Sequence, residues 1–130
     1  MKVRCQRASL VACAVTLTLS MAAASCAVRN PALYREDVRK VLETKQPVIR
    51  ACYEAELQTK PKANGRVTVH FLVERKRGTF LNPQIDDLAS TPNRTLRGCV
   101  LEALDGLGLS PPDDRAGDAT FTWDFQVSAH

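Results

Sequence analysis

Apolar and polar positions along the chain change period several times, and each change marks an element. Between residues 31 and 59 the apolar positions recur at steps of three, four and seven, which is the spacing of one helix face. Asn30 followed by Pro31 is typical of a helix start, because proline fits the first helical position. Pro47 interrupts the run, since it lacks the N–H that an inner helical turn needs. We therefore expect a kink there, or two helices with the second beginning near Gln46.

Residues 65–73 place valines and a phenylalanine at every second position, which predicts a strand with one buried face. His70 alternates out of phase with them and falls on the other face. The charged residues 74–78 end in glycine and suit a hairpin turn. A second strand over 79–85 contains Pro83, which cannot donate to a ladder. This strand is therefore expected at a sheet edge or with a bulge.

A further helix and a last strand complete the pattern. Residues 90–93 supply a helix start, and apolar positions over 96–107 follow a helical stripe. Residues 111–114 are expected to form a loop with solvated acidic side chains. Residues 120–127 carry the clearest strand pattern in the chain, with aromatic side chains and Val127 facing inward and polar side chains outward.

This order of elements predicts an α+β fold over residues 31–130. The expected arrangement is α-β-β-α-β, with a three-stranded antiparallel sheet covered on one face by two helices. About 100 ordered residues bury a modest core, so a covalent link between the helices would contribute strongly to stability.

The first 25 residues are typical of a secretory signal peptide. Basic residues lie within the first seven positions, no charged side chain occurs between residues 8 and 28, and small residues precede Cys26. The run Ala23-Ala24-Ser25-Cys26 resembles a bacterial lipobox, in which the cysteine is lipidated and becomes the first residue. Ordinary cleavage near Ala24 and an uncut anchor are the alternatives, since the uncharged run is long enough to cross a bilayer.

Removal of this segment changes the charge of the protein. The whole chain has 18 basic and 14 acidic residues and a net charge of +4. Three of the basic residues and none of the acidic ones lie in the signal, which leaves 15 against 14. A nearly neutral mature protein gives no indication of nucleic-acid binding.

The five cysteines divide in the same way. Cys5 and Cys13 leave with the signal and Cys26 takes the lipid, which leaves Cys52 and Cys99 in a compartment that permits disulfides. Both lie on apolar helical stripes that cover the same sheet, and this favours a disulfide between them. Two buried free thiols, or a redox or metal role, are the alternatives.

Catalytic and metal sites are not expected. His70 lies on the sheet face opposite the helices, out of reach of Cys52 as a general base. The chain has no C-x-x-C motif, and two cysteines cannot complete a zinc site. The aspartates at 86–87 and 113–118 lack the spacing of a calcium loop. We therefore expect no enzyme, no metal, no cofactor and no small-molecule substrate.

Three motifs and the terminal aromatic strand resemble one bacterial family. The motifs are Ile49-x-x-Cys52-Tyr53-Glu54, Gly65-x-Val67-x-Val69-x-Phe71 and Leu96-x-x-Cys99-Val100. They are similar to the AgmX/PglI C-terminal domain, named for gliding-motility proteins of myxobacteria. That family is itself similar to the C-terminal domain of TonB, the energy-coupling protein of the Gram-negative envelope. The resemblance covers roughly residues 36 to 128 and implies a TonB-C-like fold, although residues 75–79 and 107–111 depart from the family pattern.

The resemblance also implies a binding surface. The last strand would lie at the rim of the sheet, where an unpaired strand can accept an extended peptide through main-chain hydrogen bonds. The candidate partner-binding edge consists of Thr120, Thr122, Asp124 and Gln126.

The expected function is that of a small, non-enzymatic envelope lipoprotein facing the periplasm. It would bind an envelope protein or peptide in a gliding-motility or trans-envelope assembly. Residues 26–30 would be a short tether, and Ala27 after Cys26 implies export to the outer membrane. A periplasmic form is one alternative, and an inner-membrane-anchored TonB-like energy transducer with an uncleaved N-terminal segment is another. The short tether counts against the transducer, because it spans only a small gap.

Overall fold

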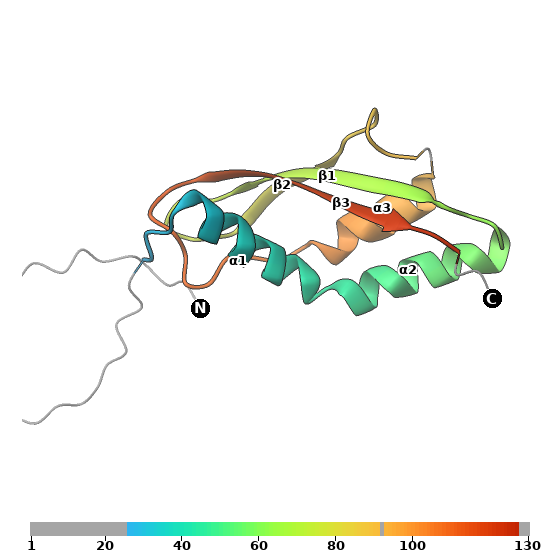
Figure 1. The fold of residues 1–130 in the computed structure, drawn as a ribbon, viewed down its shortest axis with the longest axis horizontal. Helices are drawn as coiled ribbons and strands as arrows, with labels where there is room; N and C mark the ends of the chain where they lie inside the picture. Colours follow the sequence, from blue (N-terminus) through green and yellow to red (C-terminus); the bar gives the residue numbers. More distant parts are fainter. Residues whose placement is uncertain (1–25, 92, 128–130) are drawn as a thin grey trace, which may run out of the picture.

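The structure is a computed structural model, and it describes residues 26–91 and 93–127. Three helices and one three-stranded antiparallel sheet form an α+β fold in this part of the chain (Figure 1). The elements are α1 (Pro31–Glu43), α2 (Gln46–Thr59), β1 (Gly65–Val73), β2 (Phe80–Ile85), α3 (Arg94–Ala103) and β3 (Gly117–Phe125). The predicted signal peptide, residues 1–25, lies outside the described residues.

Two helices precede the sheet. The Asn30 side chain caps α1 as predicted, because its Oδ1 accepts a hydrogen bond from the Leu33 N–H at 2.8 Å. Pro47 lies in the first turn of α2, where its missing N–H would have had no helical partner. The chain therefore breaks into two helices near Gln46, one of the two predicted alternatives. The predicted order α-β-β-α-β, with two helices, is corrected to α-α-β-β-α-β with three.

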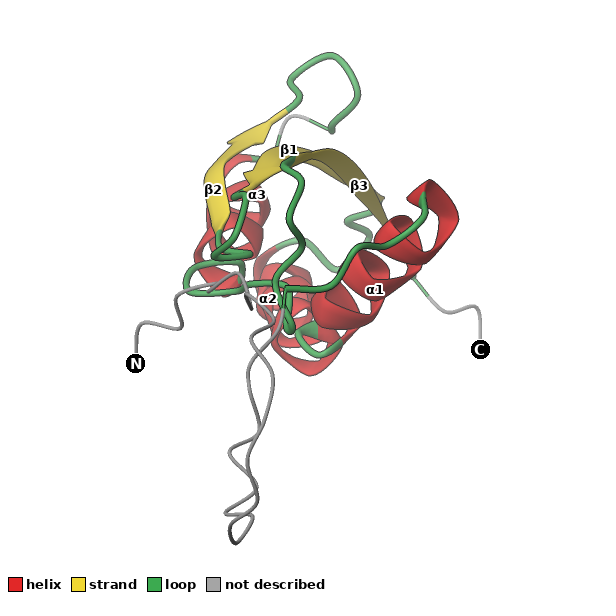
Figure 2. Ribbon diagram, turned by 90° about the vertical axis from the view of Figure 1, so that its left-hand side faces the viewer, coloured by secondary structure: helices red, strands yellow, loops and turns green. Residues whose placement is uncertain are grey.

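The sheet has the order β2-β1-β3, with β1 antiparallel to both neighbours. Figure 2 shows the helices gathered on one face of this sheet. Side chains at every second position of β1, from Val67 to Val73, are buried as predicted. They share one core with side chains of all three helices, among them Leu42, Ile49 and Val100.

A disulfide joins two of the covering helices. Cys52 of α2 and Cys99 of α3 are bonded as predicted, with Cα atoms 5.8 Å apart. Tyr53 follows Cys52, and its hydroxyl donates a 2.5 Å hydrogen bond to the Ala63 carbonyl in the loop between α2 and β1. The Tyr53 ring also lies against Phe125 of β3, with centroids 5.1 Å apart. This corner therefore connects α2 covalently to α3 and by packing to the sheet.

β2 has the irregular geometry that its proline predicts. The register with β1 shifts between His70 and Leu72, and Asn82 adopts a positive φ of 50°. β2 lies at one edge of the sheet. Position and bulge both match the prediction from Pro83, because an edge strand can lose one donor without breaking the ladder.

The last strand differs from its predicted limits. β3 begins at Gly117 and ends at Phe125, so it is displaced toward the N-terminus of the predicted 120–127 segment. Val127, predicted on the inner face, lies beyond the strand and is 46% exposed. All nine residues of β3 have a partner in β1, from the pair Val73–Gly117 to the pair Gly65–Phe125. The length of β3 is therefore set by the length of β1.

Candidate functional site: the open edge of β3

The two edges of the sheet differ in how they are covered. β2 is short and bulged, and the segment after α3 bonds to its beginning: the Phe80 N–H donates to the Leu107 carbonyl at 3.0 Å. β3 is a regular strand at the other end of the order β2-β1-β3. No strand of the described residues pairs with its outer side. Among the two edges, β3 is therefore the one open to an added strand.

The contacts of β1 indicate which main-chain groups of β3 face outward. Arg66 and Thr68 direct their main-chain groups away from β3: the Arg66 carbonyl accepts from Thr91, and the Thr68 carbonyl accepts from Asp86, each at 2.9 Å. In an antiparallel pair, opposite residues exchange either both hydrogen bonds or none. The partners of Arg66 and Thr68 in β3 therefore present their own N–H and C=O to the free edge.

These partners belong to the predicted binding edge. Asp124 is opposite Arg66, Thr122 is opposite Thr68, and Thr120 follows at the next outward position. The structure thus brings Thr120, Thr122 and Asp124 together along one line of unpaired main-chain groups. Gln126, the fourth predicted residue, is exposed and lies just beyond the end of β3.

The side chains of this line interact with β1 across the solvent-facing side of the sheet. Thr122 and Thr68 join their hydroxyl groups at 2.8 Å, and the Thr120 hydroxyl lies 2.6 Å from His70 Nδ1. Arg66 and Asp124 form an exposed ion pair at 3.5 Å. These contacts hold the three side chains against β1 on the face of the sheet.

The other side of β3 supplies apolar surface. Trp123 and Phe125 are buried, whereas Phe121 is only partly buried and stacks on Trp123 with centroids 4.7 Å apart. An added strand would therefore meet polar side chains on one face and the rim of an aromatic cluster on the other. Such a two-sided edge selects segments that alternate in polarity.

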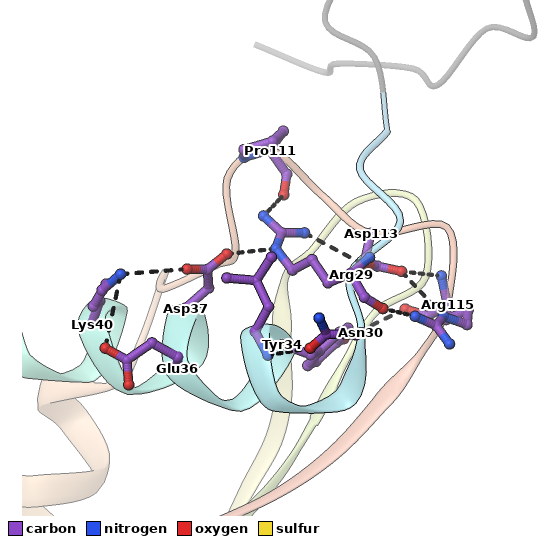
Figure 3. Close-up of polar contacts among 10 residues, drawn as sticks. Arg29, Asn30, Tyr34, Glu36, Asp37, Lys40, Pro111, Asp113 and Arg115 are labelled. Atoms are coloured by element: carbon purple, nitrogen blue, oxygen red, sulfur yellow. Dashed lines mark hydrogen bonds and ion pairs between the residues drawn. The ribbon is translucent and has the colours of Figure 1, made fainter.

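A buried ionic cluster holds the N-terminal segment to the loop that leads into β3 (Figure 3). Arg29 is 4% exposed and Asp113 is 1% exposed. The Arg29 N–H donates to Asp113 Oδ2 at 2.9 Å, and its guanidinium donates to Asp37 at 2.6 Å and to the Pro111 carbonyl at 2.7 Å. Arg115 closes the cluster through the Arg29 carbonyl and Asp113.

This cluster changes two expectations from the sequence. Asp113, expected as a solvated turn residue, is a buried carboxylate. The segment expected as a free tether is bound, because the Ala27 N–H donates to the Pro112 carbonyl and the Asp114 N–H to the Ala27 carbonyl. Neither residue was found from the sequence, because Arg29 and Asp113 are 84 positions apart and no periodic pattern relates them.

The charge state of Asp113 follows from these contacts. Burial alone raises the pKa of its carboxyl. The N–H groups of Arg29 and Arg115 and their guanidinium charges outweigh burial, so the pKa lies below its ordinary value. Asp113 is therefore ionised at neutral pH and compensates the buried charge of Arg29.

Cys26, the predicted lipidation site, is the first described residue. Ala27, which follows it, bonds to the 112–114 loop, so a lipid on Cys26 would lie next to this end of the domain. Lipidation of Cys26 stays a prediction.

The described residues give no sign of a metal site or a membrane span. They contain no group of three or more metal-binding side chains and no helix long and apolar enough to cross a membrane. His70 is 49% exposed on the outer sheet face, bonded to Asp86 and Thr120, whereas Cys52 is buried under the helices. The structure does not bring the two together, as predicted. Comparison with protein-family models, with curated proteins and with solved structures found no match to this chain.

Proposed function

We propose that this protein is a non-enzymatic binding module that takes up an extended segment of a partner protein along β3. The observation that carries the proposal is the contrast between the two sheet edges. β2 is protected by a bulge, a proline and a bound loop, whereas β3 pairs regularly over its whole length and has no strand of the described residues on its other side. Natural sheets normally cover or shorten such an edge, so an open one suits strand addition.

The proposed interaction uses the outward groups of every second residue of β3, from Asp118 to Asp124. A matching segment is about 30 Å long for nine residues. Each main-chain hydrogen bond contributes about 0.5–1.5 kcal/mol net, so a segment that forms several of them gains useful affinity without a deep pocket. The partly buried Phe121 adds apolar contact on the inner side.

We place the module in the cell envelope, as a member of the AgmX/PglI family with a TonB-C-like fold. Support comes from the three sequence motifs and from an α+β fold in which two of those motifs carry the Cys52–Cys99 disulfide. A disulfide fits a compartment outside the cytoplasm. The partner would be another envelope protein or peptide, within a gliding-motility or trans-envelope assembly.

The N-terminal segment defines the form of attachment. Our leading proposal is a lipoprotein of the outer membrane that faces the periplasm, lipidated on Cys26. The second candidate is a TonB-like transducer anchored in the inner membrane by its uncleaved N-terminal segment.

The intact mass of the protein from native membranes, before and after reduction, separates the two forms. A chain that begins at Cys26, carries acyl groups and gains two hydrogens on reduction supports the lipoprotein. A full-length chain that still begins at Met1 supports the anchored form. The bound segment Ala27–Asn30 leaves little free chain between either anchor and the domain, which counts against a long reach across the periplasm.

The binding edge is tested by Thr122→Pro. Because the Thr122 N–H faces outward, proline removes an edge donor without removing a hydrogen bond to β1. Thr122→Val is the matched control, since it also loses the hydroxyl contact to Thr68 but keeps the N–H. The probe is an array of decapeptides with alternating polar and β-branched residues.

We expect Thr122→Pro to weaken binding to this array by at least about fivefold relative to Thr122→Val, which corresponds to one hydrogen bond of about 1 kcal/mol. Thermal unfolding of the two variants, followed by circular dichroism, should agree within a few degrees. Equal binding by the two folded variants would show that the edge of β3 is not the binding surface.

A further inference from the structure

A groove of about 240 Å³ lies where β3 begins. It is lined by Pro31, Tyr34, Arg35, Arg115, Ala116 and Gly117. Its walls therefore come from the first turns of α1 and from the residues that lead into the open strand. Figure 2 shows α1 on the β3 side of the sheet, away from β2.

Gly117 is required for the shape of this groove. A Cβ atom at Gly117 would lie 2.6 Å from the Tyr34 ring, too close for a real contact. The missing side chain lets the Tyr34 ring pack directly against the strand, and the Tyr34 hydroxyl reaches the Arg115 carbonyl at 3.4 Å. The floor of the groove is thus an aromatic ring at the first residue of β3.

Two guanidinium groups border this apolar floor. Arg35 is exposed and forms no ion pair within the described residues. Arg115 is half-exposed and contacts Asp113 and the Arg29 carbonyl. The nearest acidic residue of β3, Asp118, is one position along from Gly117, so it lies on the opposite face of the sheet. An anion attached to an apolar group matches this combination of ring and arginines.

We propose that the groove binds the C-terminal carboxylate of an extended segment that pairs antiparallel with β3. This inference rests on the proposed function and adds the direction and the terminal chemistry of the ligand. A segment antiparallel to β3 ends beside Gly117, where its carboxylate meets Arg35 and Arg115. A parallel segment would place its positive amino terminus there instead, against like charges.

The geometry favours a chain terminus over an acidic side chain in mid-segment. Strand pairing cannot continue past Gly117, because Arg115 and Ala116 form a wall of the groove. The last residue of a segment that stops there offers a carboxylate to the arginines and a side chain to Tyr34. The polar groove at the other end of β3 gives no such preference, since its Arg66 and Asp124 already pair with each other.

The test uses the whole protein and the decapeptide array in two forms. One form is coupled through the amino terminus and has a free carboxylate, and the other has the same sequences with a C-terminal amide. We expect the free acids to bind about fivefold more tightly than the amides. Arg35→Gln should remove this difference, whereas Arg50→Gln, an exposed arginine of α2, should preserve it.

The outcomes separate this inference from the proposed function. If acids and amides bind equally, or if the preference survives Arg35→Gln, the carboxylate site is wrong and strand addition still stands. If neither form binds at all, strand addition itself fails and the groove has no ligand of this kind. A photo-crosslinker on the last peptide residue should label residues 31–35, and labelling of residues 124–127 instead would refute the antiparallel direction.

Discussion

Removal of the Cys52–Cys99 disulfide should reduce the stability of this fold by about 4 kcal/mol. The bond joins α2 to α3 across 47 positions of sequence, and the loop that it closes contains β1 and β2. In the unfolded chain the bond restricts this whole loop, whereas in the folded chain the two helices already lie together. The bond therefore acts mainly by lowering the entropy of the unfolded state.

The magnitude follows from the loop length. A closed loop of this size corresponds to about 4 kcal/mol at 25 °C in the chain-entropy relation. For a domain of this size each kcal/mol changes Tm by several degrees, so loss of the bond should lower Tm by roughly 15–30 °C. Folded domains have only about 5–15 kcal/mol of stability in total. The reduced protein is therefore expected close to the limit of folding.

The assay is urea unfolding of the wild type and of the double variant Cys52→Ala, Cys99→Ala, each with and without reductant. Cys52 is 6% exposed, so its replacement also loses about 1 kcal/mol of packing. Under reducing conditions, the difference in free energy of unfolding between the two proteins measures this packing loss, and Cys26 is reduced in both. Subtracting it from the difference under oxidising conditions gives the contribution of the disulfide. A remainder below about 1 kcal/mol would refute the loop-entropy argument.

Two further predictions concern single residues. Asp113→Asn should destabilise the fold by about 1.5–3 kcal/mol in urea unfolding at pH 7, because it removes the buried carboxylate that accepts from the Arg29 and Arg115 N–H groups and leaves Asp37 alone to pair with the Arg29 guanidinium. The folded pKa of Asp113 is lowered, so its contribution is complete above the unfolded value near 4 and is lost as the pH falls through the folded value. The free energy of unfolding of the variant should therefore fall less between neutral and acid pH than that of the wild type. The same pH dependence in both proteins would contradict an ionised Asp113 in the fold. Gly98→Ala should raise the free energy of unfolding by about 0.5–1 kcal/mol, because Gly98 lies inside α3 and a Cβ there meets nothing within 4 Å; a loss of stability would exclude that open space.

Periodicity in the sequence is sufficient to predict the sheet and its core. The alternation in β1 sets which side chains are buried, and Pro83 correctly indicates an irregular edge strand. Pro47 indicates a change of helix but does not by itself separate a kink from a new helix. That choice depends on where the second helix begins, because proline is tolerated only in the first turn. The limits of β3 are set by pairing with β1, which lies far away in sequence.

The residues at the rim of the sheet were predictable from the sequence, but the direction of their main-chain groups was not. Resemblance placed Thr120, Thr122 and Asp124 on a rim strand, and the outward direction of their main-chain groups follows only from the contacts of Arg66 and Thr68. The groove at Gly117 has no periodic signature, because it joins a helix start and a loop. Arg29 and Asp113 are equally hidden, since charged residues beside prolines predict a solvated turn in most sequences.

The ionic cluster connects the proposed point of attachment to the start of β3, the proposed binding strand. Ala27 bonds to the 112–114 loop, Arg115 donates to the Arg29 carbonyl, and β3 begins two residues later at Gly117. The proposed anchor before residue 27, lipid or helix, would therefore hold this end of β3 nearest to the membrane. A partner segment that pairs antiparallel would then point its C-terminus toward that same membrane, with its chain running away over about 30 Å. A partner tail that ends at that membrane surface fits this geometry. A tail that comes from the opposite membrane fits only if it runs along the whole of β3 and ends at the groove.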